Sequence, residues 1–157
     1  MNEPTQRIRR GQPADLPAME SLLRSAGLPT EDIRSIPGLQ TWVVEVGDSI
    51  RGAIALEPFA QEGLLRSLAV TPDARSQGLG RMLVAQLESD ARADGVRSLV
   101  LLTQTAVTFF RKLGYEVVDR GDVSNEVKES AQFRSLCPAT ATCMTKRLVR
   151  SSENANG

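Results

Sequence analysis

The chain has 157 residues, 41% of them hydrophobic, and its 19 basic and 19 acidic side chains give a formal net charge of zero. This balance, with no basic stripe of interleaved aromatic residues, argues against a nucleic-acid partner, and no apolar run is long enough to span a membrane. A chain of this length can bury one core, so we expect a single domain over residues 6–148, between flexible tails at 1–5 and 151–157.

Three further features of the composition narrow the chemistry. The start, Met1-Asn2-Glu3-Pro4, has no signal-peptide core, so we expect a cytoplasmic protein. Two cysteines in that compartment are expected to be free thiols. The chain has no histidine, so any proton transfer must use a carboxylate, a tyrosine or water.

Hydrophobic periodicity and turn residues predict alternating strands and helices along the chain. The first half contains a predicted strand at 6–10, a helix at 13–27 and a short second helix with a loop at 29–37. Two strands follow, at 41–46 and 49–56, joined by a Gly47-Asp48 hairpin. The second half contains, in order, strand 64–70, helix 78–94, strand 97–102, helix 105–113, strand 115–119, a short helix at 124–135 and strand 140–148. The apolar strand at 97–102 is typical of a parallel strand covered on both faces.

A glycine-containing turn, Arg75-Ser76-Gln77-Gly78-Leu79-Gly80, joins the strand at 64–70 to the long helix after a break at Pro72-Asp73. The first N–H groups of a helix have no partner within it, and the helix dipole makes that end positive. Gly78 and Gly80 remove the Cβ atoms that would keep a phosphate away, and Arg75 and Arg81 add charge. The pattern predicts a phosphate site, although an ordinary left-handed turn before a helix would also explain the glycines.

Two other phosphate-binding loops are excluded by the spacing of this turn. A Walker loop needs a Lys-Ser/Thr pair after its last glycine, and Arg81-Met82 stand there instead. The dinucleotide-binding form needs three glycines, and this turn has two.

Two segments carry a resemblance to a known family. The run from Leu68 to Leu83 is similar to the acetyl-CoA-binding signature of the GNAT acetyltransferase superfamily, and the run from Ala106 to Tyr115 resembles its later Leu-Gly-aromatic landmark. The resemblance covers about residues 6–148. It implies an α/β fold with a central mixed sheet of about seven strands flanked by helices, and an N-acetyltransferase that uses acetyl-CoA as cosubstrate and no metal.

The resemblance also implies where the cosubstrate binds. The pantetheine arm would lie in a splay between the fourth and fifth strands, against the backbone of Leu68 and Val70, and the pyrophosphate would rest on residues 77–81. The backbone N–H of Val70 would stabilise the oxyanion. The residues expected to contact the cosubstrate are Leu68, Ala69, Val70, Arg75, Ser76, Gln77, Gly78, Leu79, Gly80, Arg81, Thr103 and Phe110.

The chain departs from the family pattern at the expected proton donor. The usual tyrosine position holds Phe110, which cannot donate a proton, so water or another residue must protonate the leaving thiolate. Tyr115, the only tyrosine, is expected to pack in the core. A general base would be Glu62, Glu57 or a water that one of them orients, and the alternative is that both are solvated loop carboxylates.

Arg66 is the third candidate catalytic residue, with Val70 and Glu62. Strand alternation would direct it to the same face as Leu68 and Val70. A charged residue in so apolar a strand is costly unless it is paired. It could clamp a substrate carboxylate with two hydrogen bonds, or pair with a structural acid such as Glu57.

A finer resemblance concerns the acceptor. The segment Phe133–Met144, with Leu65–Val70 and Leu101–Ala106, resembles the arsenic-resistance N-acetyltransferases, and the last run also resembles the acetyltransferase domain of N-acetylglutamate synthases. Both imply a small-molecule amine acceptor such as glutamate or an arsenic-containing or phosphinic analogue, with hydroxyls of Thr103 and Thr105 near the acetyl group. The resemblance also allows a homodimer through the C-terminal strands.

Three alternatives stay open at this point. Cys137 and Cys143 could coordinate trivalent arsenic, or they could be small buried hydrophobic residues. The chain could be a non-catalytic acetyl-CoA-binding or sensing domain, since the tyrosine is missing. It could also acetylate a protein or another amine.

Overall fold

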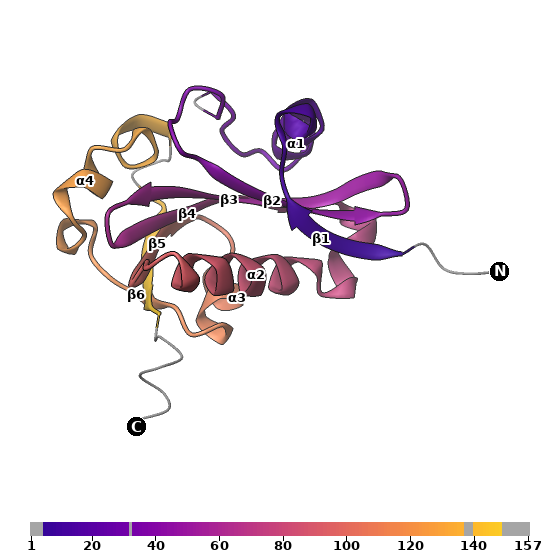
Figure 1. Cartoon of the computed structure of the whole chain (residues 1–157). Coiled ribbons are helices and arrows are strands. Elements are labelled where there is room, and N and C mark those ends of the chain that lie inside the picture. Colours follow the sequence, from indigo (N-terminus) through magenta and orange to yellow (C-terminus); the bar gives the residue numbers. More distant parts are fainter. Residues whose placement is uncertain (1–4, 32, 137–139, 149–157) are drawn as a thin grey trace. The chain divides into compact units, whose positions relative to one another are not determined.

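The computed structural model describes residues 5–31, 33–136 and 140–148 (Figure 1). Its strands are β1 (Gln6–Arg10), β2 (Gln40–Val46), β3 (Ser49–Phe59), β4 (Glu62–Val70), β5 (Ser98–Thr103), β6 (Glu116–Val117) and β7 (Thr142–Arg147). They follow the order β1-β2-β3-β4-β5-β7-β6 in a seven-stranded sheet. The sheet has both parallel and antiparallel pairs, which confirms the predicted mixed α/β fold.

Four α-helices and several short helical turns complete the described chain. The α-helices are α1 (Leu16–Ser25), α2 (Leu79–Ala93), α3 (Val107–Lys112) and α4 (Asn125–Lys128). The turns are the 3-10 helices η1 (Pro13–Asp15), η2 (Pro72–Gln77) and η3 (Arg120–Asp122), and the π-helical segment η4 (Gln132–Leu136). None of the described helices is long and apolar enough to cross a membrane.

The chain divides into two compact units. The first contains the residues up to Glu57 and the segment Arg66–Glu88, and the second contains Pro58–Leu65 and the residues from Ser89 onward. Three elements, β3, β4 and α2, therefore continue from one unit into the other. Each unit has its own core and is described by itself.

In the first unit, α1 packs on the antiparallel strands β1, β2 and β3. Met19 of α1, Val43 of β2 and Ala53 of β3 form a buried cluster. Figure 1 shows α1 and the beginning of α2 on opposite sides of β2 and β3. The apolar spacing that predicts this helix therefore marks the face that it buries.

An ion-pair network fixes the beginning of α1. The guanidinium of Arg9 donates to both carboxylate oxygens of Asp15, at 2.8 and 2.9 Å, and also pairs with Glu45. The backbone N–H of Gln12 donates to the same Asp15 carboxylate at 2.7 Å. These bonds, led by the one from Arg9, lower the pKa of the nearly buried Asp15.

The second unit is built around β5. Its residues Ser98–Val100 pair in parallel with Glu62–Leu64 of β4, and its other edge is antiparallel to β7, which in turn pairs with β6. The buried cluster of this unit contains Leu64, Val100, Val123, Val127 and Cys143. The predicted parallel pairing of the apolar strand is confirmed on its β4 side.

The structure corrects three predicted elements. The described residues of 29–37 form turns instead of a helix, because Pro37 disfavours the helical conformation at Ile36 and Gly38 follows with φ +72°. The predicted helix at 124–135 is α4, which ends at Lys128, followed by the separate segment η4. The predicted strand at 115–119 is the two-residue β6.

Candidate functional site

The candidate phosphate site is the turn between β4 and α2, which lies in the first unit. After Val70, Thr71 is extended and Pro72–Gln77 form a 3-10 turn. Gly78 then adopts φ 75° and ψ 17°, and α2 begins at Leu79, one residue later than predicted. A Cβ at Gly78 would have no atom within 4 Å, so the left-handed backbone, and not lack of space, makes glycine suitable here.

This geometry leaves backbone donors at the beginning of a long helix. The N–H of Met82 donates to the carbonyl of Gly78 at 3.1 Å, which is the first bond of the helix. The N–H groups of Leu79, Gly80 and Arg81 precede that bond, so they have no acceptor within α2. Together with the dipole of a 15-residue helix, they can hold phosphate oxygens.

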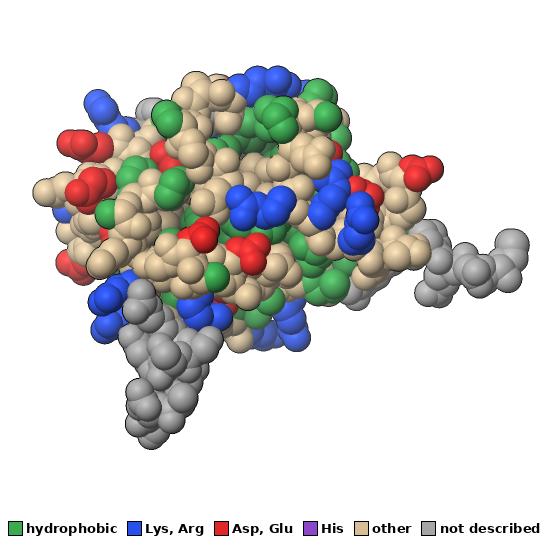
Figure 2. All heavy atoms as spheres, in the orientation of Figure 1, with side chains coloured by type: hydrophobic (Ala, Val, Ile, Leu, Met, Phe, Trp, Pro, Cys, Tyr) green, Lys and Arg blue, Asp and Glu red, His purple; other side chains and the backbone are tan. Residues whose placement is uncertain are grey.

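The charged and polar side chains predicted for this site are described in part. The side chain of Arg81 is exposed, so it can approach a bound anion. The side chains of Arg75, Ser76 and Gln77 lie outside the described part of the structure. On the face shown in Figure 2, basic side chains are interspersed with acidic ones and form no continuous basic area.

Residues of β3 hold the turn, and sequence reasoning did not find them. The N–H of Thr71 donates to the carbonyl of Arg51 at 2.8 Å, and Nη1 of Arg51 donates to Oδ2 of Asp73 at 2.6 Å. The hydroxyl of Thr71 and the charge of Arg51 lower the pKa of Asp73. No motif marks Arg51, because the contact depends on how β3 lies against a residue 22 positions later in the chain. The nearest sequence signal is the acid in Pro72-Asp73.

The last part of β4 is not a regular strand. Ser67 has φ +60°, which interrupts the extended backbone between Arg66 and Leu68. Arg66 is buried, Leu68 and Val70 are half-buried, and Ala69 is buried. The expectation that strict alternation places Arg66, Leu68 and Val70 on one face is therefore wrong, since the irregular residue shifts the alternation.

Arg66 lies in the interior of the first unit with an acidic partner. Its side chain is fully buried, and Nη1 lies 3.3 Å from Oε1 of Glu57. Its Nε lies 3.4 Å from the hydroxyl of Ser67. Pairing with Glu57 is one of the two roles expected for Arg66, and the structure contains that pair. The role of Arg66 as a clamp for a substrate carboxylate stays a prediction.

Two candidate residues in the second unit have polar atoms with different surroundings. Oε1 of Glu62 is buried and has no hydrogen-bond partner in the part of the chain that the structure describes. The hydroxyl oxygen of Thr103 accepts a hydrogen bond from the N–H of Ala106 at 3.0 Å. A buried carboxylate oxygen without a donor is costly unless water or a ligand binds it, so Glu62 is the stronger candidate for chemistry.

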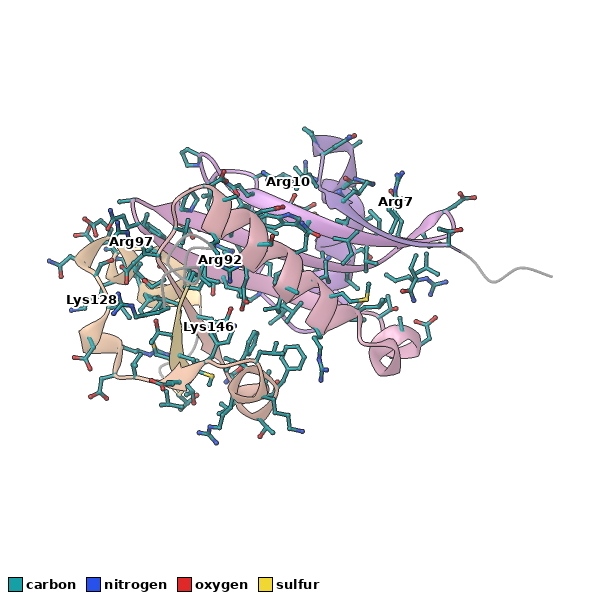
Figure 3. All side chains as sticks on the ribbon, turned by 60° about the horizontal axis from the view of Figure 1, so that its bottom comes forward. Arg7, Arg10, Arg92, Arg97, Lys128 and Lys146 are labelled. Atoms are coloured by element: carbon teal, nitrogen blue, oxygen red, sulfur yellow. The ribbon has the colours of Figure 1, made fainter. Side chains whose placement is uncertain are left out.

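Phe110 and Tyr115 pack together in the second unit. Phe110 is 4% exposed, and its ring makes edge-to-face contacts with Phe109 and Tyr115 at centroid distances of 5.0 and 5.4 Å. Tyr115 is 1% exposed, which confirms that it is a core residue. Lys146, labelled in Figure 3, lies over the Tyr115 ring, and its Nζ donates to the carbonyl of Leu113 at the end of α3.

The two cysteines, for which arsenic binding and simple burial are the alternatives, are described only in part. Cys143 is a free, buried thiol in the core of the second unit, and burial raises its pKa to about 11. Such a thiol is a poor nucleophile and a poor metal ligand. Cys137 lies outside the described residues, so the proposed pair stays a prediction.

The comparison with protein families agrees with the geometry of the turn. A family model described as an acetyltransferase (GNAT) domain matches residues 37–117, which is more than half of the chain. The matched range includes the Gly78 turn, α3 and β6.

The chain is similar to parts of longer curated proteins. It is 41% identical over 76 residues to the amino-acid acetyltransferase of Ectopseudomonas mendocina, which covers 47% of this chain and 18% of that protein. It is 36% identical over 75 residues to the amino-acid acetyltransferase of Serratia proteamaculans, which covers 46% and 17%. The chain thus matches less than a fifth of the length of these relatives.

Solved structures share the fold at low sequence identity. N-acetylglutamate synthase from Neisseria gonorrhoeae, complexed with coenzyme A and N-acetyl-glutamate, has a TM-score of 0.79 at 22% identity and covers 95% of this chain and 36% of its own. The ribosomal-protein-S18-alanine N-acetyltransferase from Escherichia coli has a TM-score of 0.74 at 21% identity and covers 96% and 98%. At these identities the similarity concerns the fold alone.

Proposed function

Because the chain belongs to the GNAT acetyltransferase family, we propose that it transfers the acetyl group of acetyl-CoA to the amine of a small α-amino acid. The observation that carries this proposal is the turn at Gly78, whose left-handed backbone leads directly into the first N–H groups of α2, which have no acceptor within that helix. The curated relatives described above are amino-acid acetyltransferases, which supports an amino acid as the acceptor.

The residues of the turn fit the phosphates of the cosubstrate. The N–H groups of Leu79, Gly80 and Arg81 would bind the pyrophosphate, and the exposed Arg81 side chain would add charge. The pantetheine arm would lie along the backbone of residues 68–70. The roles of Arg75, Ser76, Gln77, Thr103 and Phe110 in binding come from the family resemblance.

Acetyl-CoA supplies an acetyl group that is activated as a thioester. The amine nitrogen forms a bond to the carbonyl carbon, the carbon–sulfur bond breaks, and the amine loses one proton. Glu62 would accept that proton, directly or through water, since its buried Oε1 has no donor among the described residues. The N–H of Val70 would stabilise the charge on the carbonyl oxygen, and the sulfur would take its proton from water, because Phe110 has no hydroxyl.

The positive charge of Arg66 narrows the class of acceptor to amines that also carry a carboxylate. A guanidinium has five N–H donors, so Arg66 could bind a substrate carboxylate while it keeps its contact with Glu57. Glutamate and its phosphinic or arsenic-containing analogues are the acceptors that the sequence resemblance favours. A homodimer through the C-terminal strands is part of the same proposal.

A second candidate function is a non-catalytic acetyl-CoA-binding domain. It is favoured by the burial of Phe110 and Tyr115 in one aromatic cluster, which leaves no tyrosine hydroxyl at the position of the usual proton donor. A thiolate is a good leaving group that water can protonate, so acetyl transfer can proceed without a dedicated acid, and we place this candidate second.

The test is CoA-thiol release from acetyl-CoA with a panel of amines. The panel contains glutamate, phosphinic and arsenic-containing glutamate analogues, other amino acids, polyamines, aminoglycosides and a lysine peptide. Turnover restricted to amino acids is the expected result, and turnover restricted to another class would overturn the acceptor. Tight acetyl-CoA binding without turnover on any amine would favour the second candidate.

A further inference from the structure

Two consecutive residues of β3 contact the chain on both sides of the phosphate turn. The carbonyl of Arg51 accepts the N–H of Thr71, which is the residue before the turn. A Cβ added at Gly52 would lie 3.1 Å from Cδ1 of Leu83, in the second turn of α2, and 2.9 Å from Cγ1 of Val44. At Gly52 the backbone of β3 is therefore packed closely against α2. One residue earlier, at Arg51, it is hydrogen-bonded to Thr71, which follows the end of β4.

The side chain of Arg51 adds a third contact, inside the turn itself. Its Nη1 donates to the carboxylate of Asp73 at 2.6 Å, and Asp73 is the second residue of the 3-10 segment. Among the described backbone bonds outside regular helices and strands, a single bond leads from this segment back to Thr71. The N–H of Ala74 donates it to the carbonyl of Thr71. The Arg51–Asp73 contact thus ties the beginning of the turn to β3.

We propose that Arg51 is a positioning residue for the phosphate turn, which it holds in the conformation that presents the first N–H groups of α2. This inference rests on the proposed binding of the CoA phosphates at the turn. A turn that is held in the free protein loses less conformational freedom when a ligand binds, so the ligand binds more tightly.

A purely electrostatic role of Arg51 makes a different prediction. If Arg51 only neutralised the carboxylate or attracted phosphate, removing the charge of Asp73 would strengthen CoA binding, because a negative charge near the phosphates would be lost. If Arg51 positions the turn, Asp73→Asn weakens CoA binding, because the ionic contact with Arg51 that helps to hold the turn is lost. The sign of this one substitution separates the two roles.

The experiment is calorimetric titration of the full chain with CoA and with S-acetyl-pantetheine, which carries the acetylated pantetheine arm but lacks the adenosine and all the phosphates. We expect Arg51→Ala and Asp73→Asn each to weaken CoA binding about fivefold and to leave S-acetyl-pantetheine unchanged. The exchanged pair, Arg51→Asp with Asp73→Arg, should restore most of the affinity. The matched control is Arg34→Ala, which removes an exposed arginine that is paired with Glu20 in the same unit.

The outcomes distinguish this proposal from its premise. Tighter or unchanged CoA binding by Asp73→Asn, or equal weakening of both ligands by Arg51→Ala, would overturn the positioning role while the phosphate site stands. If the unmodified protein binds CoA no more tightly than S-acetyl-pantetheine, the phosphate site itself is wrong, and the role of Arg51 is wrong with it. Thermal unfolding of each variant checks that the fold is retained.

Discussion

The turn at Gly78 and the helix α3 carry the two halves of the family resemblance, and they differ in the kind of group that they offer. The turn acts through backbone N–H groups and one left-handed residue, and both are present in the structure. In α3 the chemistry would come from a side chain, and the position holds a buried phenylalanine. A role of the backbone tolerates changes of side chain, whereas the role of one hydroxyl ends with a single substitution and must pass to another group, here water.

The largest expected effect concerns Glu62, the proposed acceptor of the amine proton. Glu62→Gln should lower kcat about 100-fold at neutral pH, because the amine would lose its proton acceptor. The loss should shrink at higher pH, where the amine loses its proton without help. Steady-state kinetics across pH measure both effects. Glu116→Gln, at an exposed position in the same unit, should leave kcat unchanged, and an equally active Glu62→Gln would show that Glu62 is not the base.

The ion-pair network of Arg9 and Asp15 belongs to neither segment. A substitution there should change the free energy of unfolding and not catalysis. Asp15→Asn should lower the free energy of unfolding by about 2 kcal/mol at pH 7, because its carboxylate accepts charged hydrogen bonds from Arg9. The pKa of Asp15 is lowered in the folded protein, so its contribution is complete above the unfolded value near 4 and is lost as the pH falls through the folded value. Urea unfolding between pH 3 and pH 7 tests this: an equal loss of stability in both proteins would contradict it.

A substitution at Gly78 should disrupt the conformation of the turn. Gly78→Ala should weaken CoA binding about tenfold, because an L side chain is strained at φ +75° and the first turn of α2 would shift. Gly27→Ala is the matched control, since Gly27 also has a positive φ, +73°, and open space around its Cβ position in the same unit. Titration calorimetry should show normal CoA binding for Gly27→Ala, and equal affinities for the two variants would exclude a special role for Gly78.

The smallest expected effect on catalysis belongs to Phe110. Phe110→Leu should lower the free energy of unfolding by about 1 kcal/mol through lost edge-to-face contacts, while kcat changes less than twofold. Thermal unfolding and the CoA-thiol assay measure the two quantities. A large loss of kcat in a folded variant would mean that Phe110 contributes to the reaction and not only to packing.

Sequence alone predicted the features that depend on local pattern. The apolar spacing of Met19 and its neighbours indicated the buried face of α1, and the strand–glycine–helix order indicated the turn at Gly78. It did not predict the features that depend on contacts between distant residues. The ion pair of Arg51 with Asp73 depends on the register of β3. The positive φ of Ser67 is not indicated by its residue type, because serine also occurs in regular strands.

The central claim is that the backbone N–H groups at the beginning of α2 bind the phosphates of CoA. The most direct measurement is the NMR amide spectrum of the ¹⁵N-labelled protein during titration with CoA and with S-acetyl-pantetheine. We predict large shifts of the Leu79, Gly80 and Arg81 amides with CoA and small shifts of the same amides with S-acetyl-pantetheine. Saturating CoA binding that leaves these three amides unchanged would contradict the account.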